Sequence, residues 1–169
     1  MRTLAASREL LAGKRVLELG SGCGLVGLAV ARLGAASVVL SDTPAATGVL
    51  ELLRENAQLN AGEGCPVSVL ALDWAEGTGD DPLFDLVLGS DVLYHLGHAQ
   101  LLAHIIAARL TRNVEALALL MCPLRTSALL PALQAAGEAL GLRLDAATEP
   151  DAAHEGGMAI IRLAWAACA

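Results

Sequence analysis

The sequence has no excess of positive charge. Its 169 residues include 11 Lys and Arg against 18 Asp and Glu, which leaves a net charge of −7 at pH 7. Proteins that bind a nucleic-acid backbone usually carry a basic face, so this balance argues against a nucleic-acid partner.

The sequence also lacks a long apolar run, a secretory leader and paired cysteines. Hydrophobic residues make up 55% of the chain, yet no uncharged apolar segment approaches the roughly 18 residues that suggest a membrane span. Charges interrupt the first 13 residues, which is unlike a signal peptide. Cys23, Cys65, Cys122 and Cys168 form no CxxC pair. We therefore expect a soluble protein with reduced thiols in the cytoplasm or the nucleus, and no membrane partner.

Short apolar strands alternate with amphipathic helices along the whole chain. This alternation, followed by a terminal strand pair, predicts an α/β fold: a single doubly wound, Rossmann-like seven-stranded sheet, mostly parallel with an antiparallel terminal strand. A polar loop through residues 148–157 is expected between the last two strands. With no repeat or linker in the sequence, residues 1–169 are expected to form one domain. The predicted strands are 15–19, 37–41, 67–72, 84–89, 116–122, 142–146 and 158–165, and the predicted helices are 25–33, 47–60, 98–109 and 127–140.

A glycine-rich loop follows the first predicted strand. Gly20, Gly22 and Gly24 alternate, and Gly22, Gly24 and Gly27 match the pattern GxGxxG. Glycines at such a turn let a ligand approach the backbone and the helix N-terminus. Asp42 ends the next strand, where ribose hydroxyls are commonly bound, so an NAD-dependent oxidoreductase is one interpretation.

Two further features favour S-adenosylmethionine over NAD. Glu18 ends a buried strand, where a carboxylate is costly without a partner, and the ammonium group of a cationic ligand would be one. Asp73 and Trp74 end the third strand, and together they offer a carboxylate acceptor and a flat ring to an adenine. Trp74 read by itself is equally well explained as a core residue.

These motifs stand in order at the ends of successive strands. They are Glu18-Leu-Gly-Ser-Gly-Cys-Gly24, Ser41-Asp42, Leu72-Asp73-Trp74 and Gly89-Ser-Asp-Val-Leu-Tyr94. From about Leu10 onward the chain resembles the seven-stranded protein-lysine methyltransferases that modify chaperones and elongation factors. The resemblance implies an S-adenosylmethionine-dependent N-methyltransferase with a protein substrate, such as a chaperone or a translation factor.

The resemblance also implies roles for single residues. Gly20, Ser21 and Gly22 would hold the methionine and ribose side of the cofactor, with Glu18 and Gly24 in the same loop. Asp42 would hold the ribose hydroxyls, Asp73 and Trp74 would flank the adenine, and Ser90 would line the pocket. Members of the family usually carry an N-terminal tryptophan lid, and with only about 14 residues ahead of the first strand such a lid is expected to be absent here.

Asp91 and Tyr94 are the candidate catalytic residues. Methyl transfer is an in-line displacement, so the enzyme mostly aligns an amine lone pair and excludes water. Asp91 would hold the incoming amine by a charge-assisted hydrogen bond, and Tyr94 would orient it. In the competing interpretation Asp91 caps a helix turn and Tyr94 only packs.

Other residues carry weaker signals. His95, His98 and His104 lie close together in the sequence without a set of Cys or carboxylate ligands, so no metal site is expected. Arg125 is expected to be a surface arginine, although a contact with substrate or cofactor stays open. A second class of function also stays open, namely a module that binds S-adenosylmethionine without turnover and acts through protein interaction.

Overall fold

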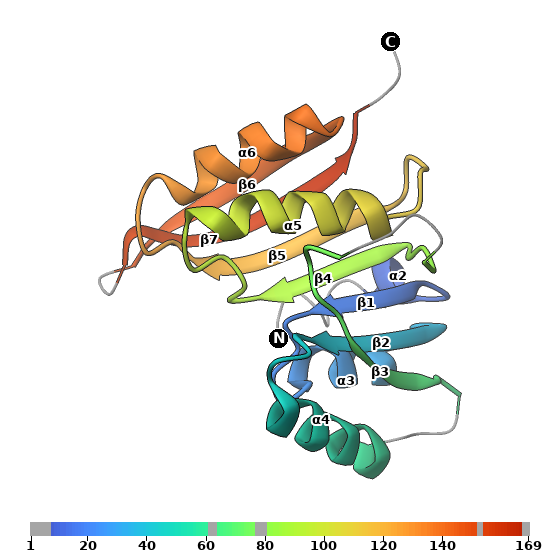
Figure 1. Cartoon of the computed structure of the whole chain (residues 1–169). Coiled ribbons are helices and arrows are strands. Elements are labelled where there is room, and N and C mark those ends of the chain that lie inside the picture. The colour runs from blue at the N-terminus through green and yellow to red at the C-terminus, as the bar shows by residue number, and fades with distance from the viewer. Residues whose placement is uncertain (1–7, 61–63, 77–80, 152–153, 167–169) are drawn as a thin grey trace. The chain divides into compact units, whose positions relative to one another are not determined.

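The computed structural model describes residues 8–60, 64–76, 81–151 and 154–166. Its seven strands have the order β3-β2-β1-β4-β5-β7-β6, as the alternating pattern predicts for a mostly parallel sheet with an antiparallel end. The contacts divide the chain into two compact units, Met1–Asp73 and Trp74–Ala169, which are described one at a time below (Figure 1). The prediction of one domain over residues 1–169 stays a prediction, and the first seven residues of the expected N-terminal extension lie outside the described part.

The first unit is a three-stranded parallel sheet with its helices. It contains α2 (Arg8–Leu11), β1 (Arg15–Leu19), α3 (Leu25–Arg32), β2 (Ser37–Asp42), α4 (Thr47–Asn60) and β3 (Val67–Ala71). β2 lies between β1 and β3, with Leu17 opposite Val39 and Leu40 opposite Val69. Four of the five side chains of β1 are buried, as an apolar run without alternation predicts for a parallel strand covered on both faces. All three parallel strands of this unit end at the same edge, which is where the predicted ligand residues follow them.

The second unit combines parallel and antiparallel strands. It contains β4 (Leu86–Ser90), α5 (Leu96–Arg109), β5 (Leu117–Pro123), α6 (Leu129–Ala139), β6 (Leu142–Asp151) and β7 (His154–Trp165). β4 and β5 are parallel, whereas β7 runs antiparallel to both β5 and β6. Helices α5 and α6 pack side by side over these strands (Figure 1). Within the described residues, none of the helices has the length and apolar character that crossing a membrane requires.

The predicted polar loop at residues 148–157 is wrong. β6 continues to Asp151 and β7 begins at His154, so these residues extend a β-hairpin in which Glu149 lies opposite Met158. Pro150 is tolerated because β6 is an edge strand and its register shifts between Glu149 and Asp151, and proline is found at such edges and bulges. Polar residues indicated a loop here, whereas Thr148, Glu149 and Pro150 are exposed residues of the edge strand β6.

Smaller differences concern the ends of elements. β4 begins at Leu86 rather than residue 84, because Phe84 makes only an isolated parallel bridge to Leu110. α5 begins at Leu96, two residues before the predicted start, and the short helix α2 was not predicted. These shifts of one or two residues leave each predicted ligand residue at the carboxyl end of its strand.

Candidate active site

The glycine loop of the first unit has the conformation that its sequence predicts. Gly20, Gly22 and Gly24 have φ angles of 61°, 55° and 82°, in the left-handed region that glycine enters without steric cost. Ser21 ties the loop to β2, because its N–H donates to the Ser41 carbonyl (2.8 Å) and its hydroxyl accepts from the Ser41 N–H (3.0 Å). The loop is therefore fixed at the N-terminus of α3, the end of a helix that favours negative charge.

Asp42 is fastened to this loop. Its Oδ2 accepts a hydrogen bond from the Gly22 N–H at 2.9 Å, and its Oδ1 accepts one from the Thr43 N–H at 2.8 Å. A carboxylate has about four acceptor sites, so lone pairs are left for hydroxyl donors. The side chain is half-buried and its orientation is set before any ligand arrives. This geometry suits the predicted contact with a ribose diol.

Glu18 lies beneath the same loop. Its side chain is buried, with 2% exposure, and its Oε2 accepts from the Gly27 N–H at 3.2 Å. Burial raises the pKa of Glu18 from 4.5 to about 7, against the hydrogen bonds from Ser21 and Gly27 that lower it, and the nearby charge of Asp42 raises it further. The hydrogen bonds from Ser21 and Gly27 thus compensate the charge of the Glu18 carboxylate only in part. A cation bound at the loop would favour its ionised form.

The space over the loop accommodates a ligand. A methyl group built on Gly22 would meet no atom within 4 Å, whereas one on Gly27 would overlap Leu40 and Glu18. Gly27 therefore serves the packing of α3 against β1 and β2, and Gly22 borders open space. Together with the fixed Asp42, this open side fits a nucleoside cofactor such as S-adenosylmethionine.

Asp73 follows β3 at the end of the first unit. The Leu72 N–H donates to the Asp42 carbonyl at 2.9 Å, so the chain leaves β3 alongside the end of β2. Asp73 itself is exposed. Within this unit hydrogen bonds thus bring Glu18, the glycine loop and Asp42 together, and Asp73 lies two residues after the end of β3.

Trp74 belongs to an aromatic cluster in the second unit. Its ring meets His98 edge-on, with the centroids 5.8 Å apart, and His98 also contacts Tyr94 at 5.4 Å and His95 at 3.7 Å. Trp74 is half-exposed, so the interpretation as a core residue is wrong. Burial lowers the pKa of His98, and His95 adds to that effect, so this histidine stays neutral at pH 7.

Ser90 is the last residue of β4, and Asp91 follows it. Ser90 is exposed, and Asp91 has a φ of 52°, which makes it the one non-glycine residue with a positive φ in the described part of the chain. Asp tolerates this conformation better than most residues, and the Asp91 N–H donates to the Met121 carbonyl at 2.8 Å.

The Asp91 carboxylate faces Arg125, which follows β5. The Arg125 Nη1 and Nη2 donate to the two carboxylate oxygens at 3.0 and 3.3 Å, and the guanidinium lies 4.7 Å from the centre of the Tyr94 ring. The hydrogen bond to Asp91 raises the pKa of Arg125, which therefore stays cationic. Asp91 and Tyr94, the predicted catalytic pair, thus both contact the Arg125 guanidinium. Its contact with Asp91 has the bidentate geometry that arginine and carboxylate favour.

This pairing decides two points that the sequence left open. The residue that precedes α5 at its N-cap is His95, and no side chain caps this helix, so Asp91 does not act as its cap. Arg125 is a surface residue with a specific partner, which the sequence did not identify. A signal was available, because β4 and β5 are sequential strands and the residues that follow neighbouring parallel strands lie close together.

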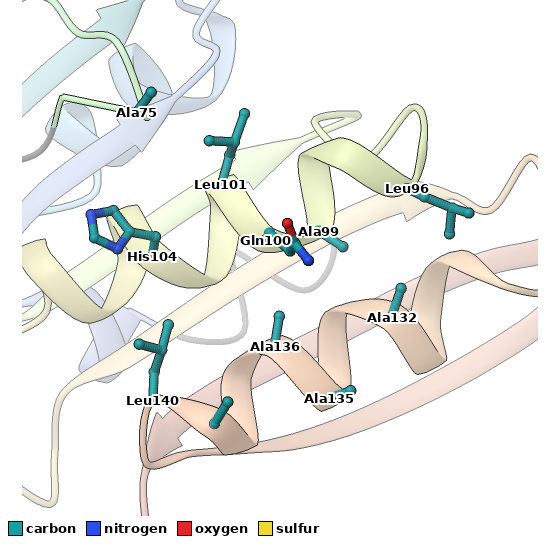
Figure 2. A pocket seen from close by; sticks show the side chains of 11 residues that line it. Ala75, Leu96, Ala99, Gln100, Leu101, His104, Ala132, Ala135, Ala136 and Leu140 are labelled. Atoms are coloured by element: carbon teal, nitrogen blue, oxygen red, sulfur yellow. The ribbon is translucent and has the colours of Figure 1, made fainter.

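A separate hollow of about 820 Å³ lies between α5 and α6 (Figure 2). Four alanines of α6 border it, together with residues of α5 such as Leu96 and His104. None of the predicted site residues lines it. Among the described residues there is also no group of three His, Cys, Asp or Glu that could hold a metal ion.

Known proteins are similar to this chain in sequence and in fold. A family profile described as lysine methyltransferase matches residues 3–128. The histone-arginine methyltransferase METTL23 of Xenopus laevis is 42% identical over 90 residues, which are 52% of this chain and 37% of that protein. The protein N-lysine methyltransferase METTL21A of Danio rerio is 42% identical over 88 residues (50% and 38%), and the EEF1A lysine methyltransferase 3 of Xenopus tropicalis is 40% identical over 83 residues (48% and 35%). The chain therefore matches less than two fifths of the length of these relatives.

Solved structures agree on the fold. The ribosomal protein L11 methylase of Lactobacillus delbrueckii subsp. bulgaricus superposes with a TM-score of 0.68 at 20% identity, covering 96% of this chain and 76% of that one. The magnesium protoporphyrin IX methyltransferase of Synechocystis PCC 6803, with S-adenosylhomocysteine bound, gives a TM-score of 0.69 at 17% identity, covering 96% and 78%. At such identities the likeness speaks for the fold alone, and that fold is the predicted one.

Proposed function

This chain belongs to the lysine methyltransferase family, and on that premise we propose that it transfers a methyl group from S-adenosylmethionine to a lysine side chain of a protein. The observation that carries the proposal is the pair Asp91 and Tyr94. Their carboxylate and aromatic ring both contact a cation, the guanidinium of Arg125. A protonated lysine is a cation of the same charge. The cofactor follows from the family and fits the open glycine loop.

The residues of the first unit account for cofactor binding. The loop backbone at Gly20, Ser21, Gly22 and Gly24 would hold the methionine and ribose side, and Asp42 would accept hydrogen bonds from the ribose hydroxyls. Glu18 would stabilise the bound cation from below the loop. Asp73 and, in the second unit, Trp74 would contact the adenine, whose amino group and ring face suit a carboxylate and an indole. Ser90 would line the pocket.

The cofactor supplies a methyl group on a positively charged sulfur. Asp91 would hold the incoming amine, and Tyr94 would orient it so that the nitrogen lone pair points at the methyl carbon. In the transfer one N–C bond forms as one S–C bond breaks, and the methylated nitrogen afterwards releases a proton to water. Since a lysine amine has an ordinary pKa of about 10.4, the site must first admit its neutral form.

An arginine side chain is the second candidate acceptor. The similarity to METTL23, whose name describes a histone-arginine methyltransferase, equals the similarity to METTL21A in identity. Both acceptors are cationic, and both fit a carboxylate beside an aromatic ring. Our hypothesis for the acceptor protein is a translation factor or a chaperone in the cytoplasm. Such a protein contains both lysine and arginine side chains.

One experiment tests the function and the acceptor together. The purified chain is incubated with a cell lysate and S-adenosylmethionine labelled in the methyl group, and labelled proteins are digested for mass spectrometry. We expect at least one labelled protein, with the label on lysine. Label on arginine would replace the lysine proposal, and label at the level of a sample without the chain would contradict transfer.

Calorimetry separates the remaining alternatives. We expect S-adenosylhomocysteine to bind and NAD not to bind, because Glu18 and Asp73 serve a cationic nucleoside and a dinucleotide has no need of them. Binding of S-adenosylhomocysteine without any transfer in the lysate would favour a non-catalytic binding module. Preference for NAD would favour an oxidoreductase.

A further inference from the structure

Holding an amine next to a carboxylate creates a chemical conflict. A negative charge close to an ammonium group stabilises it and raises its pKa, whereas attack on a methyl group requires the neutral amine. An isolated Asp91 would bind a lysine well and at the same time oppose its deprotonation.

The structure supplies a counter-charge at that carboxylate. Arg125 follows β5, 34 residues after Asp91, and its guanidinium meets both carboxylate oxygens. The side chains of Asp91 and Arg125 are 46% and 37% exposed, so the pair stands at the surface and not in the core. A carboxylate with a bidentate arginine is neutral overall while its oxygens keep free lone pairs.

The other titratable groups around the pair add little charge. Cys122 in β5 is buried, which raises the pKa of its thiol and keeps it neutral. His98 in α5 is held neutral by burial. Tyr94 and His95, whose rings contact His98, complete the surroundings. Arg125 is therefore the cation that offsets Asp91 in the described part of the site.

We propose that Arg125 is a positioning residue for methyl transfer, which neutralises Asp91 and holds its carboxylate so that the arriving amine can lose its proton. The proposal rests on the proposed lysine methyl transfer. Arg125 takes no part in bond making. It acts through Asp91, and through the Tyr94 ring over which its guanidinium lies.

The variant Arg125→Gln tests this role through the dependence of rate on pH. The rate is measured on the labelled lysate protein from pH 7 to pH 10, at saturating cofactor. With Asp91 left uncompensated, the rising limb of the profile should move up by about 0.5–1 pH unit, as one charge at several Å produces in a partly hydrated site. The rate at pH 7 should fall about 3- to 10-fold, the rate at pH 10 should stay within about twofold, and the KM for the acceptor should be unchanged or lower.

Two further variants make the result specific. Arg125→Lys keeps the charge and should restore most of the wild-type profile. Arg112→Gln is the matched control, because the Arg112 guanidinium also lies over an aromatic ring, that of Trp165 at 4.2 Å, and its loss should leave the profile in place. Affinity for S-adenosylhomocysteine, measured by calorimetry, should be the same in all variants.

The outcomes separate this inference from the function on which it rests. A loss in Arg125→Gln that is equal at every pH, or a loss of S-adenosylhomocysteine binding, would show a merely structural role and overturn the proposal. An unchanged profile would overturn it as well. If the wild-type chain labels nothing in the lysate, the proposed function itself fails.

Discussion

The two units hold their carboxylates in opposite ways. In the first unit, Glu18 and Asp42 accept hydrogen bonds from backbone N–H groups of the glycine loop, the start of α3 and the residue after β2. In the second unit, Asp91 is held by the exposed side chain of Arg125. Backbone donors cannot be exchanged by mutation without remaking the loop, whereas a side-chain partner can be replaced in a single variant. The carboxylates of the first unit are thus part of the loop itself, and the charge at Asp91 depends on one other residue.

The largest expected effect is at Asp91. Asp91→Ala should lower the turnover number about 30- to 1000-fold, because losing a charge-assisted contact in the transition state costs about 2–4 kcal/mol. Affinity for S-adenosylhomocysteine should change little, since the contacts that fasten the glycine loop lie in the first unit. Asp145→Ala, at an exposed position of β6, serves as the control. Normal turnover in a folded Asp91→Ala variant would remove this carboxylate from the chemistry.

The buried carboxylate of Glu18, in the first unit, should make the free energy of unfolding depend on pH. Because the pKa of Glu18 in the folded chain is about 7 and its ordinary value is 4.5, the favourable contribution of this group is complete below pH 4.5 and is lost as the pH rises through 7. The loss amounts to about 3 kcal/mol, at 1.36 kcal/mol for each pKa unit. Glu18→Gln removes this dependence.

Urea unfolding at pH 5 and pH 8 measures the pH-dependent contribution of Glu18 to stability. The free energy of unfolding of Glu18→Gln, relative to wild type, should be higher at pH 8 than at pH 5 by about 2–3 kcal/mol. Glu55→Gln, at an exposed position of α4 in the same unit, should show the same difference at both pH values. Equal behaviour of the two variants would mean that Glu18 is not desolvated in solution.

A variant of Asp42 tests whether the carboxylates of the first unit serve cofactor binding and not turnover. Asp42→Ala should weaken binding of S-adenosylhomocysteine about 10- to 100-fold, because it removes the acceptors for the ribose hydroxyls and the anchor of Gly22, contacts worth about 1.5–3 kcal/mol. Calorimetry measures the affinity, and the turnover number at saturating cofactor should stay within about threefold. A drop in turnover with unchanged affinity would reverse the roles assigned to the two units.

The smallest effect is expected at Tyr94. Tyr94→Phe keeps the ring under the Arg125 guanidinium and removes only the hydroxyl, so the rate should fall less than about 10-fold. Tyr94→Ala, which removes the ring as well, should cost more. If Tyr94→Phe matched Asp91→Ala, the hydroxyl would orient the amine and the ring would be secondary.

The sequence by itself determined the strand order along the chain, the glycine loop and the positions of Glu18, Asp42, Asp73 and Asp91 at strand ends. These follow from short-range patterns: apolar runs make buried strands, and alternating glycines allow the positive φ angles of the turn. The hydrogen bond from Gly22 to Asp42 was not predicted, although a βαβ unit brings consecutive strand ends together.

Only the tertiary structure decided what Asp91 and Pro150 do. The partner of Asp91 lies 34 residues away, and it is the pairing of β4 with β5 that brings Arg125 to it. Pro150 and its polar neighbours indicate a loop until β6 is placed at the edge of the sheet, where a missing N–H donor and a polar face cost little. Strands and turns arise from interactions between residues near in sequence, whereas an ion pair and an edge position depend on which distant segments the fold brings side by side.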